Sequence, residues 1–438
     1  MEFMMKVALL DVQSQKHGRI NKDVMSGFGA GYGMGHSFVP WAVSRAKRRS
    51  VVLPELPFGY IASIFRNRRA QILVTENPDI EADIIFIHSS LVGSDQEREV
   101  ASKIARRGKA RVGFIGPLAT AMPERFLDSG HFVIRGEPEA ACLRAPDEWS
   151  PEGVIESQRL DDLDAIPLPG WEFFNVSRFR YSPSLTVRPI VPVLASRGCN
   201  FTCTYCPYRW YQGTWRARST ENVLDEIKYL VQRFHVRGIV FRDPLFTFDR
   251  ERTLEIARGM LGANLDLRWV CETRLETLDR ELLETMHRAG LRAINVGIES
   301  SSPESLKSAA RNAMPFQRQR ELVRICDRLH VRVTAFYVLG LPGDTRDSIL
   351  HTIEHAIRLE THVAEFYVAT PFPGSPLYNQ VKDRLVTEDL TQYDGFTPVF
   401  RHDNLSCDEL VRLRETAFTR YYLRPAYMAN HIRRRLWR

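Results

Sequence analysis

The chain of 438 residues is long enough for about two or three domains, and its 44% hydrophobic and 26% charged residues are ordinary for a soluble globular protein. No stretch approaches the roughly 18 uninterrupted apolar residues of a membrane span, and the 7 cysteines, an odd number, argue against a disulfide framework. The net charge of +7 comes from arginines spread along the chain, so we expect no nucleic-acid partner. The N-terminus runs straight into a strand pattern without a signal-peptide layout, which predicts a cytoplasmic protein.

The first third of the chain alternates between strand-like and helix-like segments. Strands are predicted at 6–12, 70–75, 83–88, 110–115 and 132–134, and helices at 54–68 and 96–107. Such alternation is typical of a parallel sheet covered on both faces, which binds ligands beyond the carboxyl ends of its strands. The glycine-rich stretch 27–35 does not join a strand tightly to a helix, so we interpret it as a flexible loop and favour phosphate binding less.

A second series of strands and helices follows a proline-rich, acidic segment at 160–171, which we interpret as an interdomain linker. Six strands are predicted at 190–196, 238–242, 268–271, 293–298, 333–339 and 364–369. The helices between them begin after typical capping residues, namely Ser219 or Thr220, Asp249, Asp279, Ser302 and Asp344 or Thr345. Six parallel strand–helix units predict an open partial barrel, with its chemistry at the carboxyl ends of the strands.

Three cysteines stand directly after the first strand of this series. Cys199, Cys203 and Cys206 form a C-x3-C-x2-C pattern, and thiolates so closely spaced on a loop suit a soft metal centre with one open coordination position. A structural zinc site would normally be closed by a fourth Cys or His, and the nearest downstream histidine, His235, is too far along the chain. A zinc-binding structural protein is therefore the less favoured alternative.

Charged and polar residues follow the next three strands of the series. Asp243 comes after the second, Glu272 and Arg274 after the third, and Glu299 with Ser300 after the fourth. Each of these residues could equally belong to a solvated rim or a salt bridge. Cys271 also falls at a strand end, where a buried core cysteine is more common than a catalytic thiol, and Cys142, Cys326 and Cys407 are interpreted as packing residues.

The cysteine pattern, with Tyr205 just before the last cysteine, resembles the signature of the radical S-adenosylmethionine (SAM) superfamily. The resemblance implies that Cys199, Cys203 and Cys206 hold a 4Fe–4S cluster whose open iron binds SAM. It further implies SAM contacts from Tyr205, beside the adenine, and from four residues at the strand ends: Asp243, Arg274, Glu299 and Ser300.

A second resemblance concerns the N-terminal region. The segment 56–62 is similar to the first helix of the cobalamin-binding domain that precedes many radical SAM domains. The residues that fall where the strand-end loops of that domain should be, and that the resemblance assigns to cobalamin, are Ser89, Ser90, Leu91, Gly116, Pro117, Gly136 and Glu137. The Asp-x-His-x-x-Gly motif for a lower cobalt ligand is absent, because Asp11 lies six residues before His17. A degenerate domain without cofactor therefore remains an alternative.

These observations predict an α/β protein with four parts. They are a Rossmann-like domain of the cobalamin-binding type at 1–155, a linker at 156–189, a partial (β/α)6 radical SAM barrel at 190–384, and a small helical region at 385–438. Within the last part a helix is expected at 408–422, ended near Pro425. The basic tail 431–438 could contact an anionic membrane surface or an acidic partner, or could be a solvated helix end, which we prefer.

The resemblance implies a cobalamin-dependent methyltransferase that acts on an unactivated carbon or on phosphorus, with a 4Fe–4S cluster, SAM and cobalamin as cofactors. It also implies a small-molecule substrate, of natural-product or lipid-like type, and an electron donor of the flavodoxin or ferredoxin type. An enzyme for ring formation or rearrangement without net methyl transfer is the first alternative. A non-catalytic iron–sulfur or cobalamin sensor is the second, although the sequence offers no output module for it.

Overall fold

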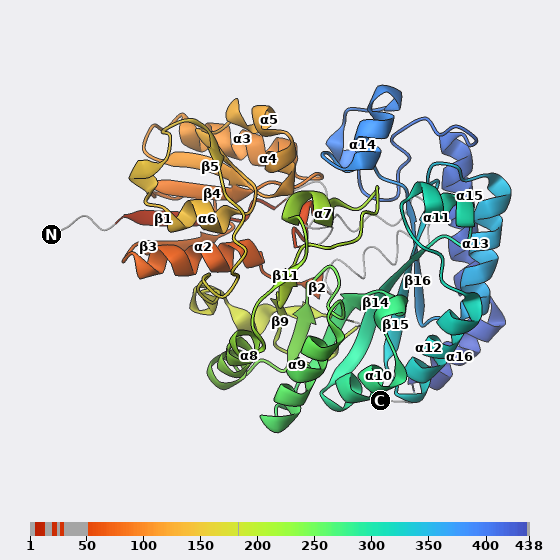
Figure 1. Ribbon diagram of the computed structural model, residues 1–438. Helices are drawn as coiled ribbons and strands as arrows, with labels where there is room; N and C mark the ends of the chain where they lie inside the picture. The colour runs from red at the N-terminus through yellow and green to blue at the C-terminus, as the bar shows by residue number, and fades with distance from the viewer. Residues whose placement is uncertain (1–4, 14–19, 24–26, 30–50, 183, 436–438) are drawn as a thin grey trace.

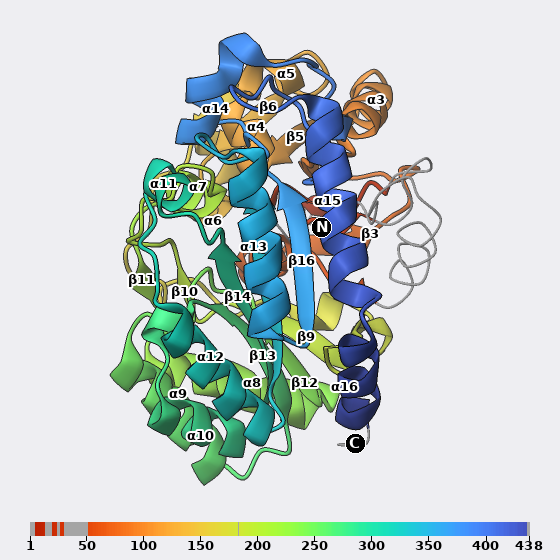
Figure 2. The same cartoon turned by 90° about the vertical axis from the view of Figure 1, so that its right-hand side faces the viewer.

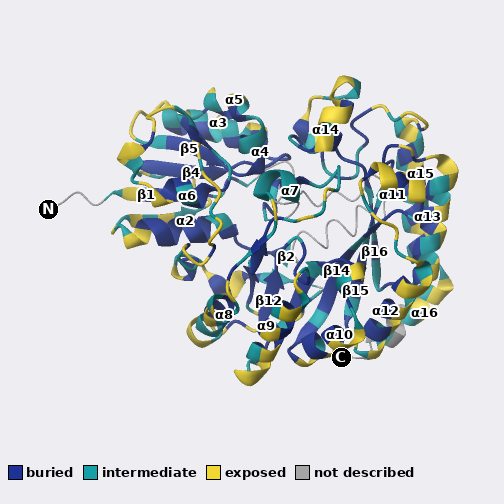
Figure 3. Ribbon diagram, in the orientation of Figure 1, coloured by how far each residue is buried: buried dark blue, intermediate teal, exposed yellow. Residues whose placement is uncertain are grey.

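The structure, a computed structural model, describes residues 5–13, 20–23, 27–29, 51–182 and 184–435. Two parallel sheets of six strands each organise it, and Figure 1 shows the N-terminal sheet in orange and the second sheet in green to blue. Helices lie on the outside of both sheets, and Figure 3 shows that the strands are the most buried elements. No helix in the described part of the chain is long and apolar enough to cross a membrane.

The N-terminal sheet has the strand order β3-β1-β4-β5-β6-β7, with every neighbouring pair parallel. Its strands are β1 (Lys6–Leu10), β3 (Gln71–Thr75), β4 (Ile84–His88), β5 (Arg111–Ile115), β6 (Phe132–Arg135) and β7 (Gly153–Glu156). All five residues of β4 are buried, because side chains on both faces are covered by helices. The predicted strands are confirmed, whereas β7, a short edge strand, was not expected.

Alternate residues of these strands face two separate cores. On one face, α2 (Leu56–Asn67) and α6 (Pro138–Leu143) cover Val7, Leu9 and Phe86. On the other face lie α3 (Ser94–Ala105), α4 (Pro117–Ala121) and α5 (Pro123–Leu127). The order of the strands reverses direction between β1 and β4, and such a switch point leaves a crevice at the carboxyl edge of a sheet.

The second sheet runs in sequence order, as a partial barrel requires: β9 (Ile190–Val193), β12 (Gly238–Phe241), β13 (Arg268–Thr273), β14 (Leu291–Glu299), β15 (Arg332–Leu339) and β16 (Val363–Val368). Its outer helices are α8 (Thr220–Phe234), α9 (Arg250–Gly262), α10 (Arg280–Arg288), α11 (Pro303–Ser308), α12 (Phe316–Arg328) and α13 (Arg346–Leu359). The side chains of Ser219, Asp249, Asp279, Ser302 and Thr345 each accept a hydrogen bond from the first turn of the helix that follows. Those predicted helix starts are therefore confirmed.

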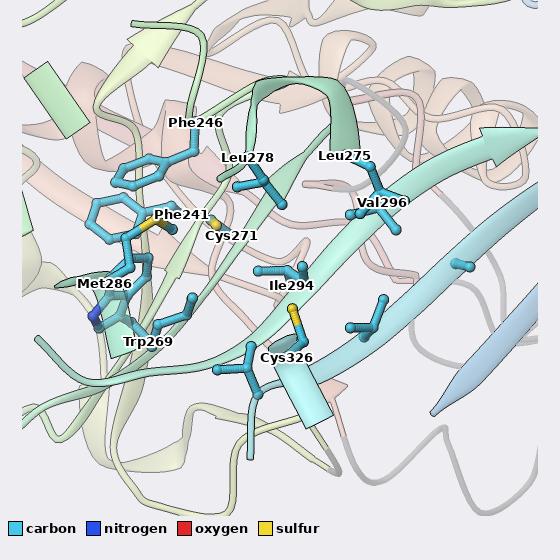
Figure 4. Close-up of a cluster of buried hydrophobic side chains, with 14 of the residues drawn as sticks. Phe241, Phe246, Trp269, Cys271, Leu275, Leu278, Met286, Ile294, Val296 and Cys326 are labelled. Atoms are coloured by element: carbon cyan, nitrogen blue, oxygen red, sulfur yellow. The ribbon is translucent and has the colours of Figure 1, made fainter. Parts of the chain in front are cut away.

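The core between the barrel strands and their helices is shown in Figure 4. The ring of Phe241 lies 5.4 Å from that of Trp269 in an edge-on arrangement, a favourable geometry for two aromatic rings. Cys271 and Cys326 are fully buried in this cluster, which confirms their packing role, and Cys142 is likewise buried in the N-terminal domain. Cys407 is only partly buried, with its Sγ 3.9 Å from the carbonyl oxygen of Phe400.

The segment after β7 packs against both domains. Trp171 is almost fully buried, its Nε1 donates to Glu226 of α8 at 3.2 Å, and Gly170 donates its backbone N–H to Gly59 of α2 at 2.9 Å. Five apolar residues of this segment belong to the same core cluster as the barrel: Leu163, Ile166, Trp171, Val176 and Phe179. The segment thus joins helix α2 of the first sheet to helix α8 of the second.

After β16 come α14 (Pro376–Val381), which still lies within the barrel part of the chain, and α15 (Cys407–Tyr422) and α16 (Pro425–Arg435), which lie in the C-terminal region. Figure 2 shows α15 alongside α13 and β16, where Leu410, Leu413 and Tyr421 extend the barrel core. Arg434 of α16 pairs with Asp327 of α12 at 2.9 Å, and the last residues of the basic tail, 436–438, lie outside the described residues.

Candidate functional site

The carboxyl edges of the two sheets face each other. Arg242, which follows β12, donates to the carbonyl oxygen of Asp23 at 2.8 Å and lies 3.3 Å from its carboxylate, and Asp23 belongs to the connection after β1. The rings of Phe28, after β1, and Phe372, after β16, are 5.4 Å apart. Since parallel sheets bind ligands beyond these edges, the site lies between the two domains.

The cysteine loop lies at this junction. It connects β10 (Ser196–Arg197), which pairs with β11 (Arg216–Ala217), to the short helix α7 (Pro207–Gln212). Gly198 has a φ of 76°, and a Cβ there would lie 2.4 Å from the carbonyl oxygen of Thr214, so only glycine fits. The backbone N–H of Cys199 donates to Gly213 at 3.1 Å, and Arg209 donates to the Cys199 carbonyl at 3.0 Å. The loop is therefore held in a defined conformation by backbone contacts.

The thiols of Cys199, Cys203 and Cys206 are all partly exposed, and Cys206 borders a cavity. Burial and neighbouring thiols raise the pKa of both Cys199 and Cys206. In the described ranges, no three side chains of His, Cys, Asp or Glu are grouped to hold a single metal ion. Three thiol donors on one short loop, one of them beside an open space, fit an iron–sulfur cluster with one iron left for another ligand.

Glu299, at the end of β14, lies close to the cysteine loop. It is a non-glycine residue with a φ of 68°, almost fully buried, and its carboxylate is 3.2 Å from Arg311. Arg311 also donates to the hydroxyl of Tyr205 at 3.4 Å and to the carbonyl oxygen of Gly297. Burial raises the pKa of Glu299 in spite of Arg311. No sequence pattern marks Arg311, because it lies in a loop without a motif.

The other predicted SAM contacts divide into two groups. Arg274 lies over the ring of Phe201 at 4.0 Å, inside the cysteine loop, and pairs with Glu276 at 2.6 Å. Asp243 instead accepts from the backbone N–H of Ala195 at 2.9 Å and from the Ser196 hydroxyl, and Ser300 accepts from the backbone N–H of Ser302 at 3.1 Å. Tyr205, Arg274 and Glu299 thus gather around the loop, while Asp243 and Ser300 brace strand ends.

A cavity of about 440 Å³ opens beside Tyr205, Cys206 and Glu299 and continues into the barrel. Apart from these three residues and Glu272, a strand-end residue, its lining was not singled out from the sequence. The additional polar and aromatic residues include Arg242, Asn295, Thr334, Phe336, Glu365 and Tyr367. The lining residues on β15 and β16 alternate with core residues along each strand. Because successive side chains of a strand point to opposite faces, the sequence could in principle have predicted that these residues face the interior of the barrel.

Ser89, Ser90 and Leu91, predicted at the cobalamin site, form the turn after β4 and are fully buried. The Ser89 hydroxyl donates to the carbonyl oxygen of Ile115 at 3.0 Å and accepts from the N–H of Ala119 at 2.9 Å. The Ser90 hydroxyl donates to Glu97 at 2.6 Å, and Leu91 lies in the core. In this structure the three residues shape the turn itself.

Gly116, Pro117, Gly136 and Glu137 form the next two turns. Gly116 has a φ of 102°, and a Cβ there would lie 2.3 Å from the ring of His88, so glycine is required for this close approach. Pro117 is buried at the start of α4, and the carbonyl oxygen of Gly136 accepts from the Tyr211 hydroxyl at 3.2 Å. These turns bring backbone to the edge that faces the barrel.

Glu137 takes part in a buried ion-pair network, the clamp, made of Glu137, Glu139, Arg197 and Arg216. Arg197 lies 2.8 Å from Glu139 and 3.4 Å from Glu137, and Arg216 lies 2.5 Å from Glu137. All four side chains are at most 9% exposed. Because the carboxylates come from the N-terminal domain and the guanidinium groups flank the cysteine loop, the clamp ties that domain to the loop.

A second buried charge cluster lies at the switch point of the first sheet. Lys22 is fully buried, with its Nζ 3.1 Å from Glu97, 3.6 Å from Glu55 and 3.7 Å from Asp11. Burial alone would lower the pKa of Lys22, but the three carboxylates raise it. His88, 3.0 Å from Glu55, has its pKa lowered to about 4 by burial and by Lys22, so its imidazole is neutral. His17 and residues 30–35 of the glycine-rich stretch lie outside the described residues.

Residues 193–356 match the model of the radical SAM superfamily. An uncharacterized methyltransferase of Pyrococcus horikoshii is 27% identical over 420 residues, 86% of this chain and 90% of that protein. The anaerobic magnesium-protoporphyrin IX monomethyl ester cyclase of Cereibacter sphaeroides is 25% identical over 377 residues, 80% of this chain and 60% of that protein. The bacteriochlorophyllide d C-12(1)-methyltransferase of Chlorobaculum tepidum is 26% identical over 339 residues, 75% of this chain and 72% of that protein.

Two solved structures share the fold. The radical S-adenosylmethionine methyltransferase TsrM from Kitasatospora setae, with cobalamin and a [4Fe-4S] cluster bound, aligns with a TM-score of 0.61 at 15% identity, covering 87% of this chain and 78% of that one. The cobalamin-dependent S-adenosylmethionine radical enzyme OxsB aligns with a TM-score of 0.67 at 13% identity, covering 94% of this chain and 66% of that one. The predicted fold, a Rossmann-like sheet followed by a partial barrel, is thereby confirmed.

Proposed function

We propose that this chain, which belongs to the radical SAM superfamily, is a cobalamin-dependent methyltransferase that acts on an unactivated carbon or on phosphorus. One observation carries the proposal: the carboxyl edges of both parallel sheets face each other, the three-cysteine loop lies between them, and Cys206 of this loop borders the cavity in the barrel. Relatives named as methyltransferases, one of them matched over nine-tenths of its length, support the same reaction class.

Cys199, Cys203 and Cys206 would hold the 4Fe–4S cluster, and Tyr205, Arg274 and Glu299 would surround SAM on its open iron. When bound, the cluster supplies the electron for reductive cleavage of SAM, and cobalamin supplies the methyl group. The Arg311 guanidinium pairs with Glu299 and opposes the rise in its pKa that burial causes. The carboxylate oxygens of Glu299 would suit the amino group of SAM.

Cobalamin would lie against the turns after β4, β5 and β6, at the edge of the first sheet that faces the barrel. The positive φ values of Gly116 and Gly136 let backbone rather than side chains form that edge, which suits a large flat ring. The buried clamp would keep this edge at a fixed position relative to the cysteine loop. The protein then contributes positioning and the exclusion of water.

An enzyme for ring formation without net methyl transfer is a second candidate, because one relative of similar identity is named as a cyclase. The two reactions leave different products. With SAM labelled in its methyl group, a methyltransferase places the label in the organic product, whereas a cyclase leaves the methyl group in methionine.

The proposed partners are a small-molecule substrate and a one-electron donor of the flavodoxin or ferredoxin type. Contact of the basic C-terminus with an anionic membrane surface stays a prediction. One of its arginines, Arg434, is engaged with Asp327 and with the carbonyl oxygen of Glu360. Co-sedimentation with anionic and with neutral lipid vesicles tests this contact.

The decisive experiment measures metal content after anaerobic purification with iron and cobalamin supplied. We expect about four irons and about one cobalt per chain. Replacement of Cys199, Cys203 and Cys206 by alanine should remove the iron and leave the cobalt. Cys407→Ala, a partly exposed cysteine outside the loop, is the matched control and should change neither metal. Iron without cobalt would refute the methyltransferase mechanism, and a chain without iron would refute the cluster.

A further inference from the structure

The cavity beside the cysteine loop runs along the interior of the barrel. On β15, Arg332, Thr334, Phe336 and Val338 line it, whereas the alternate residues Val333, Ala335 and Tyr337 are fully buried in the core. Six residue steps of a strand span about 20 Å, so the cavity extends from the cysteine loop toward the amino ends of the strands. It is therefore elongated.

A barrel of this kind is usually filled by branched apolar side chains. Here the inward positions of β15 and β16 carry instead Thr334, Phe336, Glu365 and Tyr367, among others, and about 440 Å³ is left open. This volume is in the range of about 300–1,000 Å³ that is typical of sites for small molecules, and its end beside Tyr205, Cys206 and Glu299 is the part that SAM would occupy. The interior of the barrel thus holds an open chamber instead of a fully packed core.

Aromatic rings form much of the chamber wall. The rings of Tyr367 and Phe396 are stacked, with centroids 5.3 Å apart and planes 20° apart, and Phe336 lies edge-on to Tyr367 at 6.0 Å. Tyr181 also lines the chamber, and burial raises its pKa to about 12, so its phenol is neutral. Such walls favour a ligand with an aromatic or conjugated section.

The charges of the chamber oppose an anion. Among the described residues that line it, four carry carboxylates and two carry guanidinium groups: Glu272, Glu299, Glu365, Asp394, Arg242 and Arg332. Arg242 already lies between Asp23, at 3.3 Å, and Glu272, at 2.8 Å. Burial raises the pKa of Glu272 and of Asp394, so the chamber disfavours negative charge. A phosphate placed here would meet the same penalty of burial together with the remaining carboxylate charge, and both select against it.

We propose that the substrate is an elongated, largely apolar organic molecule with an aromatic or conjugated section, neutral or cationic, which lies in the barrel chamber with its reacting atom toward Cys206. The inference rests on the proposed function and narrows it. Methyl transfer goes to carbon, and acceptors that carry phosphate or phosphonate groups are excluded.

The test measures binding of three naphthalene probes to the anaerobic, iron- and cobalamin-loaded protein by isothermal titration calorimetry. The probes are 2-naphthol, 2-(aminomethyl)naphthalene and 2-naphthyl phosphate, which share one aromatic body and differ in charge. We expect the neutral and cationic probes to bind about tenfold or more tightly than the phosphate. Equal or tighter binding of the phosphate overturns the proposal.

Two variants connect the binding to the chamber. Thr334→Trp, which fills it, should weaken 2-naphthol binding about tenfold or more, whereas Val386→Trp, at an exposed position, should not. Glu365→Gln keeps the size of the side chain and removes a carboxylate. The ratio of the 2-naphthol affinity to the 2-naphthyl phosphate affinity should therefore fall about threefold or more. If 2-naphthol binds Thr334→Trp as well as it binds the original protein, or if Glu365→Gln leaves the preference unchanged, the chamber is not the site.

Iron and cobalt measured on the same samples separate the two proposals. If cobalt is missing and the probes still bind as expected, the methyltransferase function fails and the chamber stands. If both metals are present and the phosphate probe binds best, the function stands and the substrate class is wrong.

Discussion

Glu299 combines three properties that rarely occur together: a left-handed backbone, nearly complete burial and a carboxylate at the barrel mouth. A non-glycine residue with such a φ costs of order 1–3 kcal/mol and persists only where its surroundings hold it. The ion pair with Arg311 at 3.2 Å is one such restraint. Strain of this kind is common at functional sites, which agrees with a role for Glu299 at SAM.

Glu299→Gln tests this role. It keeps the side-chain size but leaves the buried Arg311 without its carboxylate, so we expect a loss of stability of about 3 kcal/mol. SAM affinity, measured by equilibrium dialysis, should fall about tenfold while the iron content stays unchanged. Glu321→Gln, which breaks an exposed pair with Arg318 at 2.8 Å, is the control and should alter neither. Unchanged SAM affinity in Glu299→Gln would argue against a contact.

Asp243 makes stability depend on pH. Its carboxyl is fully buried beneath the end of β9, and burial raises its pKa from the ordinary 3.8 to about 6. A carboxyl whose pKa is raised on folding stabilises the folded state fully below about pH 4, and this contribution is lost as the pH rises through 6. Asp243→Asn removes the titration and can still accept a hydrogen bond from the N–H of Ala195.

We therefore expect the stability of Asp243→Asn relative to the original protein to improve by about 1 kcal/mol between pH 5 and pH 7.5. Thermal unfolding midpoints of both proteins at the two pH values measure this difference. A difference that is the same at both values, or that falls as the pH rises, would show that hydrogen bonds to the carboxylate outweigh its burial.

The clamp joins the turn after β6 to the strands that flank the cysteine loop. Arg197→Ala should lower stability by about 3–5 kcal/mol, because Glu139 and Glu137 would remain buried with one cation fewer. The amount of iron that the protein retains during gel filtration should also fall, since the cysteine loop loses its ion pairs with the N-terminal domain. Thermal unfolding and iron content measure the two effects.

Two further variants distinguish the effect of the lost ion pair from the effect of lost side-chain packing. Combining Arg197→Met with Glu139→Gln removes both charges of the 2.8 Å pair, so it should recover much of the stability that Arg197→Ala loses. Arg107→Ala, which breaks a pair with Asp79 that is 3.0 Å long but 51% and 85% exposed, should cost less than about 1 kcal/mol. A double variant no more stable than Arg197→Ala would assign the effect to packing.

Regular elements were well predicted from the sequence where their pattern is local. Helix starts such as Ser219 and Asp279 were found because a capping side chain acts on its own first turn. The short elements β7 and α4 to α6 were missed, since four to six residues hold too little of a period to be recognised. Glu137 shows a further limit. In the sequence, a polar residue that follows a strand and contacts a ligand cannot be distinguished from one that pairs with another domain. Glu137 pairs with Arg216 in this way.

Across the whole molecule, the barrel core extends beyond the proposed barrel domain. Val52, Leu56 and Tyr60, from the N-terminal domain, belong to the same core cluster as the barrel strands, together with Trp171 and Phe179 of the linker segment. The ring of Tyr60 also lies 5.0 Å from the guanidinium of Arg197. Residues outside 190–384 therefore cover part of the apolar surface of the barrel. Residues outside this range also supply Glu137 and Glu139, the carboxylates of the clamp.

The fragment 190–438 should consequently fail to fold stably. It would expose the apolar surface that Leu56 and Trp171 cover, at a cost of about 25 cal/mol for each Å² of apolar area. It would also leave Arg197 and Arg216 without their carboxylates. The fragment 156–438 restores the linker segment but not the clamp, so its stability should lie between those of the shorter fragment and the full chain.

Soluble yield, thermal unfolding midpoint and iron content of the two fragments and the full chain measure this order. A fragment 190–438 that unfolds cooperatively, within a few degrees of the full chain, would contradict the prediction. The N-terminal domain would then be a separate folding unit that only docks on the barrel. In that case the clamp would fix the position of the N-terminal domain and would not be needed for the conformation of the cysteine loop. If the predicted order holds, the loop needs both domains to keep its conformation, because its anchoring carboxylates belong to one domain and its guanidinium groups to the other.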